Sequence, residues 1–119
     1  NEMTARPHVL IGVQLDTDIF QNQHLFEVAT VHTTDSLLSR FAENEPDIVF
    51  ADSNLKGELS TFELITEIRK ISADTPIIIT ADYAARPLHK KVRQLGAQYL
   101  LTNPLSLRKV NVMIKKYLK

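Results

Sequence analysis

Five short apolar runs recur along the chain, and segments with helical spacing of apolar residues separate them. The runs span residues 9–13, 26–31, 47–51, 76–80 and 98–102. Runs of this length bounded by turn residues are typical of buried strands. Strands that alternate with helices indicate βαβ units and a parallel sheet. The pattern therefore predicts an α/β fold with helices on both faces of the sheet.

Several helices have recognisable start signals. Thr33 or Thr34 can cap a helix that follows the second run, and residues 60–63 (Ser-Thr-Phe-Glu) form a capping box. Residues 87–95 begin with proline and are followed by glycine, which is the usual order of helix start and stop signals. Between the first two runs there is room only for a short helix, roughly residues 18–23.

Composition narrows the class of protein. We expect residues 1–119 to form a single domain, and the beginning Asn1-Glu2-Met3 is consistent with excision from a longer protein. The chain has no cysteine, no apolar run long enough to span a membrane and no signal-peptide pattern, so we expect a cytoplasmic protein. The 14 basic and 14 acidic residues give zero net charge, which argues against a nucleic-acid-binding domain.

The candidate chemistry lies at the end of the third run. Asp52 closes this run, and a turn containing Asn54 and Gly57 follows at once. Open α/β sheets place their functional groups at the carboxyl ends of the strands. A carboxylate there is a nucleophile, a metal ligand or a helix cap.

Three stretches resemble the receiver domain of two-component response regulators, the CheY-like family. Residues 46–52 resemble the strand that ends in the phosphoacceptor Asp, residues 75–81 the strand with the switch Thr, and residues 96–104 the segment that ends in Lys-Pro. The resemblance covers about residues 8–118. It implies a doubly wound (βα)5, flavodoxin-like three-layer sandwich with parallel strand order 2-1-3-4-5, here with a shortened first helix. It also implies a cis bond before Pro104.

The resemblance implies five groups for phosphoryl transfer, and this chain keeps two of them. Asp52 matches the phosphoacceptor and Thr80 the switch hydroxyl, whereas Val13 and Gln14 occupy the positions of the acid pair that holds Mg²⁺, and Asn103 occupies the Lys position. We therefore interpret the chain as an atypical receiver, or pseudo-receiver, that is not an enzyme. No cofactor is expected, with Mg²⁺ bound only if the site is functional.

Some assignments stay open. Asp16 and Asp18 are weak alternative metal ligands, although helix capping is the interpretation that we favour. Asp52 either accepts a phosphoryl group or hydrogen-bonds within its own turn, and we favour the turn. The resemblance also implies an aromatic switch residue in the fifth strand. Leu100 occupies that position here, and the aromatic Tyr99 lies beside it.

The preferred function is signal reception in a bacterial-type two-component phosphorelay by a degenerate receiver that acts through protein–protein interaction. The alternatives are a working receiver phosphorylated on Asp52 and a flavodoxin-like domain that binds a small molecule. The last is disfavoured because the residues at the strand ends are mostly small or polar.

Expected partners are a histidine kinase, an output domain or a second copy, and neither nucleic acid nor membrane. They would bind the face formed by the helix at residues 87–95, the strand at residues 98–102 and the last helix. The apolar positions of that last helix are Leu107, Val110, Met113, Ile114 and Tyr117. The last helix also belongs to a basic segment, residues 105–119, which holds five cations and no acid. We interpret this segment as a solvated helix face whose cations suit the helix dipole.

Overall fold

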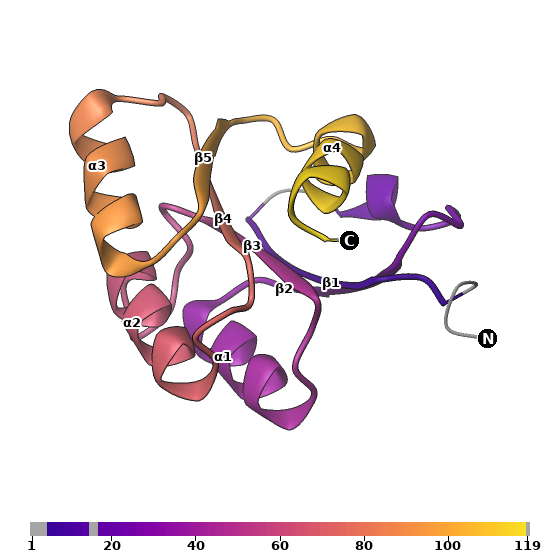
Figure 1. The fold of residues 1–119 in the computed structure, drawn as a ribbon, viewed down its shortest axis with the longest axis horizontal. Helices are drawn as coiled ribbons and strands as arrows, with labels where there is room; N and C mark the ends of the chain where they lie inside the picture. The colour runs from indigo at the N-terminus through magenta and orange to yellow at the C-terminus, as the bar shows by residue number, and fades with distance from the viewer. Residues whose placement is uncertain (1–4, 15–16, 119) are drawn as a thin grey trace.

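The computed structural model describes residues 5–14 and 17–118, and its elements follow the predicted order (Figure 1). The strands are β1 (His8–Gly12), β2 (Glu27–Val31), β3 (Ile48–Asp52), β4 (Ile77–Ala81) and β5 (Tyr99–Thr102). The helices are α1 (Thr34–Glu43), α2 (Thr61–Ile71), α3 (Arg86–Leu95) and α4 (Leu107–Tyr117), with a 3₁₀-helix η2 (Asp18–Phe20). Each strand boundary lies within one residue of its prediction.

The five strands form one parallel sheet in the order β2-β1-β3-β4-β5, which confirms the predicted fold. The core residues of α1, α2 and α3 pack on one face of the sheet, and those of α4 and η2 pack on the other (Figure 1). This is the three-layer sandwich expected of doubly wound sheets. The face that carries α4 has less helical cover than its opposite.

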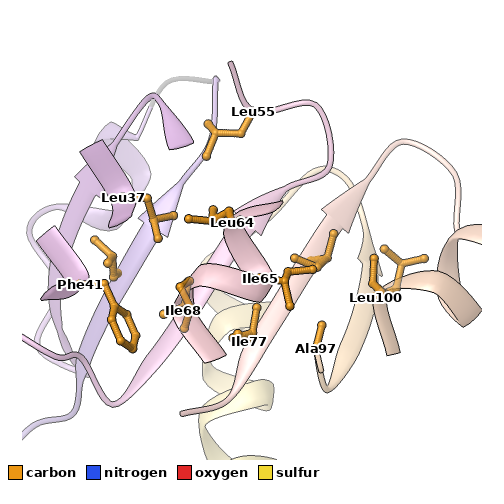
Figure 2. Packing of buried hydrophobic residues seen from close by; sticks show 14 of the residues in the cluster. Leu37, Phe41, Leu55, Leu64, Ile65, Ile68, Ile77, Ala97 and Leu100 are labelled. Carbon is orange, nitrogen blue, oxygen red and sulfur yellow. The ribbon is translucent and has the colours of Figure 1, made fainter. Parts of the chain in front are cut away.

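Alternation along β3 supplies both layers of the core. Val49 and Ala51 belong to the cluster beneath α1 to α3, whereas Ile48 and Phe50 belong to the cluster beneath α4. All four are at most 1% exposed, as the two-sided burial of a central parallel strand requires. Figure 2 shows the first cluster, in which residues from α1 and α2 meet those from β4 and β5.

The helix caps resolve what the sequence left open. Thr33 is the cap of α1, because its hydroxyl accepts from the Ser36 amide at 3.1 Å, and Thr34 instead donates to the Leu59 carbonyl. The capping box at Ser60 is confirmed, with both reciprocal hydrogen bonds formed. The cis bond before Pro104 is confirmed as well.

The first helix is shorter than the residues 18–23 that we predicted. It is the three-residue η2, and the chain leaves helical geometry at Gln21 and Asn22, where Asn22 adopts φ 56°. The Gln23 side chain then binds backbone groups of Phe20, Leu25 and Phe26. A side chain that satisfies local backbone groups in this way favours a turn over another helical turn.

Arg69 ties α2 to the beginning of β5. Its guanidinium donates to the Gly96 carbonyl and to Oε1 of Gln98, and the same Oε1 accepts from the Ile77 amide at 2.7 Å. Burial lowers the pKa of Arg69, and the nearby Asp74 carboxylate opposes that shift. The contact fixes the edge strand against α2 and β4.

We predict that Ile68→Ala and Ile71→Ala differ sharply although both lie on α2. Ile68 is fully buried and Ile71 is 48% exposed. Removing the buried side chain should lower the free energy of unfolding by about 2–5 kcal/mol, and the exposed one by under about 1 kcal/mol. Urea denaturation of both variants measures the difference, and equal losses would contradict this packing of α2.

Candidate functional site at the carboxyl ends of the strands

The pairing of β3 with β4 places the two predicted site residues side by side. Asp52 is opposite Thr80 in the strand register. Thr80 is fully buried, and its hydroxyl donates to Oδ1 of Asp52 at 2.8 Å. The Ser53 amide also donates to the Thr80 carbonyl at 2.7 Å, which extends the pairing one residue past the strand.

Two further donors hold the Asp52 carboxylate. The Asn103 side-chain amide donates to Oδ1 at 3.0 Å, and the Asn54 backbone amide donates to Oδ2 at 3.0 Å. The second bond is the local turn that the sequence predicted. Asp52 therefore accepts three hydrogen bonds and is oriented from β4, from the end of β5 and from its own turn.

Asp82 belongs to the same site, and the sequence analysis missed it. It follows β4 directly, and its Oδ1 accepts from the Asn103 side-chain amide at 2.9 Å. One amide group thus bridges two carboxylates, those of Asp52 and Asp82. The available signal was its position, since a polar residue just after a parallel strand lies at the functional edge of the sheet.

The two positions of the acid pair have structural contacts instead. Val13 is 5% exposed and packs into the core beneath α4. The Gln14 side chain donates to the His32 carbonyl at 2.9 Å and accepts from the Lys56 amide at 3.1 Å. Both ends of the Gln14 amide therefore hold together the loops that follow β1, β2 and β3.

The described residues do not supply the acid-pair magnesium site that the resemblance implies, because Val13 and Gln14 carry no carboxylate. Mg²⁺ in proteins is held by carboxylates and other oxygens in near-octahedral geometry, yet in residues 5–14 and 17–118 no three acidic or histidine side chains converge. Asp18 is exposed and begins η2, and Asp16 lies outside the described residues. Among the described residues, the carboxylates at this edge of the sheet are those of Asp52 and Asp82.

No cation in the described part of the chain pairs with Asp52 or Asp82. The ion pairs there join Arg6 to Glu27 and Lys70 to Glu67, away from the site. The Lys109 ammonium is engaged elsewhere, since it donates to the carbonyls of Thr102 and Pro104 at 2.7 and 2.9 Å. Asn103 therefore supplies hydrogen bonds but no charge where the resemblance implies a lysine.

A cavity of about 470 Å³ lies beside the two carboxylates. Its apolar lining includes Val13, Phe20 and Leu105, each at most 7% exposed. The polar lining comes from Gln14, Asp52, Asn54, Asp82 and Asn103, so the apolar wall lies beside the small or polar strand ends expected from the sequence and does not replace them. Val13 directly follows β1, whereas Phe20 and Leu105 come from η2 and from the loop after β5, two segments that the strand pattern alone does not bring together.

The family comparison agrees with this geometry, because the model of the response regulator receiver domain matches residues 11–115. The chain belongs to this family. It is thus a receiver domain of the two-component response regulator type, a class of generally non-enzymatic signalling modules. A search of curated proteins finds no match. Within the described residues, no helix has the length and apolar character to cross a membrane.

Solved receivers share the fold at low sequence identity. CheY4 of Vibrio cholerae has a TM-score of 0.82 at 19% identity, covering 96% of this chain and 100% of that one. The receiver domain of a putative LuxO repressor from Vibrio parahaemolyticus gives 0.80 at 17%, covering 94% and 89%. NtrX from Brucella abortus gives 0.81 at 20%, covering 95% of this chain. This chain spans 27% of the NtrX chain.

We predict that Thr80→Val destabilises this receiver more than Thr66→Val. Both changes replace a hydroxyl with a methyl group, but Thr80 donates to the Asp52 carboxylate while the exposed Thr66 donates only within its own helix. Loss of the buried charged hydrogen bond should lower the free energy of unfolding by about 1–2 kcal/mol. Thermal denaturation measures both variants, and equal melting temperatures would contradict the bond.

Proposed function

We propose that this domain is a pseudo-receiver that signals through protein contact and not through phosphorylation of Asp52. The observation that carries the proposal is the Gln14 amide, which stands at an acid-pair position with both of its ends hydrogen-bonded to backbone. Binding Mg²⁺ there would require a different residue and a different loop contact. Asn103 likewise uses its amide to bridge Asp52 and Asp82.

Electrostatics supports the same proposal. A carboxylate that attacks an anionic phosphoryl donor needs positive charge to bring the two together. The site instead holds two carboxylates, with no cation in an ion pair with either one among the described residues. A phosphoryl group on Asp52 would add negative charge close to Asp82. We therefore expect phosphotransfer to be very slow or absent.

We predict no response at Asp52 and Thr80 when Mg²⁺ and then beryllofluoride, a phosphoryl mimic, are added to the protein. Amide chemical shifts of the ¹⁵N-labelled domain provide the measurement. Asp52→Ala is the control, because it removes the carboxylate that a working receiver would use. Shifts around Asp52 that disappear in the control would overturn the proposal and establish a working receiver.

The charge distribution supports one surface for the proposed protein contact. All 14 acidic residues lie within residues 1–82, and nine of the 14 basic ones lie within residues 83–119. In Figure 1, α3 and α4 flank β5 at the edge of the sheet. We define the basic edge as the seven exposed cations of these two helices: Arg86, Lys90, Lys91, Arg93, Arg108, Lys115 and Lys116.

Tyr99 of β5 lies between the two halves of the basic edge. Its ring centroid is 4.6 Å from the Lys116 ammonium and 6.3 Å from the centroid of the His89 ring. Half-buried aromatic rings beside cations are common at the anchor points of protein interfaces. Leu100, which occupies the position of the switch aromatic, is instead buried in the core.

The partner that fits this surface best is an acidic protein surface, as a kinase or an output domain could present. A second copy bound face to face through the same edge would bring like charges together, which opposes association. The whole chain has a formal net charge of zero, so the part outside the basic edge is acidic. A long nucleic acid would extend over that acidic part and be repelled by it. A compact acidic patch avoids both penalties.

We predict that poly-L-glutamate, a simple acidic polypeptide, binds the domain at low ionic strength, and that Lys90→Glu/Lys116→Glu weakens binding at least about tenfold. Arg40→Glu/Lys56→Glu makes the same charge change at exposed sites outside the basic edge and should have a smaller effect. Fluorescence anisotropy measures both. Equal losses in the two variants, or tighter binding of duplex DNA, would contradict the assignment.

A further inference from the structure

The cavity beside Asp52 has the size and lining of a small-molecule site. Its volume of about 470 Å³ lies within the roughly 300–1,000 Å³ of typical ligand pockets. Val13, Phe20 and Leu105 contribute its buried apolar lining, and Ile19 contributes an apolar residue that is 50% exposed. Ile19 and Phe20 both belong to η2, which has only three residues, and both line the cavity.

The polar side of the same cavity is negatively charged. Asp52 and Asp82 line it together with the neutral Gln14, Asn54 and Asn103, and the Asn103 side-chain amide donates to both carboxylates. Each carboxylate has capacity for further hydrogen bonds, since an ionised carboxyl group offers about four acceptor positions. Hydrogen bonds from Asn103 leave the two negative charges uncompensated.

We propose that this cavity binds a small organic cation, namely an ammonium or amidinium group carried on an apolar body. The cation would lie against Asp52 and Asp82 and supply the positive charge that Asn103 lacks. The apolar body would cover mainly the half-exposed Ile19, at the edge of the buried Phe20 and Leu105. Charge complementarity and the apolar lining each restrict the ligand, and a molecule with only one of these features satisfies half of the site.

This inference goes beyond the proposed function, because it assigns a ligand to the site and does not depend on which protein binds the basic edge. It requires only that Asp52 carry no phosphoryl group. The two ideas fail separately. A response to beryllofluoride would overturn the pseudo-receiver, whereas the ligand site is tested below with probes that contain no phosphoryl mimic.

The first test compares three probes in amide chemical-shift titrations of the complete domain. Benzylamine has both the cation and the apolar body, benzyl alcohol has the same body without charge, and methylammonium has the charge without the body. We expect benzylamine to bind with a Kd on the order of 1 mM, at least about fivefold tighter than either other probe. The shifts should centre on Val13, Asn54 and Asp82.

Two pairs of variants test the two halves of the site. Asp82→Asn removes the exposed charge and should weaken benzylamine at least about threefold, while Glu43→Gln removes an exposed charge on α1 and should not. Ile19→Ala trims the apolar wall and should weaken benzylamine, while Val112→Ala on α4, which is 49% exposed, should not. All four residues are exposed, so the variants are expected to fold.

Several results would overturn the proposal. Equal affinity for benzyl alcohol would mean an apolar site without cation recognition. Equal affinity for methylammonium would mean a simple cation site. No shift with benzylamine up to 20 times the expected Kd, or unchanged affinity in Asp82→Asn, would remove the assignment altogether.

Discussion

The parallel pairing of β3 with β4 is the constraint on which the rest of this site depends. Ile48 to Ala51 are buried on both faces of the sheet, and a slip of one residue would exchange the two faces of the strand. The register is thereby fixed with Asp52 opposite Thr80. The sheet also positions the residue after β5. The backbone amide of Asn103 donates to the Ala81 carbonyl, and its side-chain amide donates to the carboxylates of Asp52 and Asp82. The row of Asp52, Asn103 and Asp82 follows from the sheet and needs no special loop.

At this site, the contacts of the neutral residues Gln14 and Asn103 explain more than those of the acidic ones. The Gln14 amide uses both its donor and its acceptor on backbone groups, so the loop that would present metal ligands is part of the scaffold. The Asn103 side-chain amide donates one hydrogen bond to each of the Asp52 and Asp82 carboxylates, but it carries no charge that would neutralise them. A domain can keep an exposed acid such as Asp82 at little cost because water screens it. The receiver fold is therefore retained with neutral side chains at two positions where the resemblance implies charged ones.

Sequence reasoning predicted the fold closely, because the strands and the Ser60 capping box rest on local patterns, while the cis bond before Pro104 followed from the resemblance to receiver domains. It placed Asp52 and Thr80 together because parallel strands end at one edge. It could not find the bridging role of Gln14, which depends on Lys56, 42 residues away. It also missed the cavity, because Phe20 and Leu105 come from segments whose approach depends on how far η2 extends. The sequence analysis considered only the basic segment at residues 105–119. The part of the chain without acidic residues begins earlier, at residue 83, and includes α3 as well as α4.

The loop after β5 joins the cavity to the basic edge. Asn103, Pro104 and Leu105 line the cavity, and the Lys109 ammonium on the first turn of α4 holds the carbonyls of Thr102 and Pro104. Ser106 caps the same turn by accepting from the Lys109 amide. The Lys109 ammonium therefore binds backbone within the domain, whereas Arg108, Lys115 and Lys116 of α4 are exposed. Because Lys109 hydrogen-bonds two carbonyls of this loop, the cavity wall is joined directly to the first turn of α4, which its own core residues hold on the sheet.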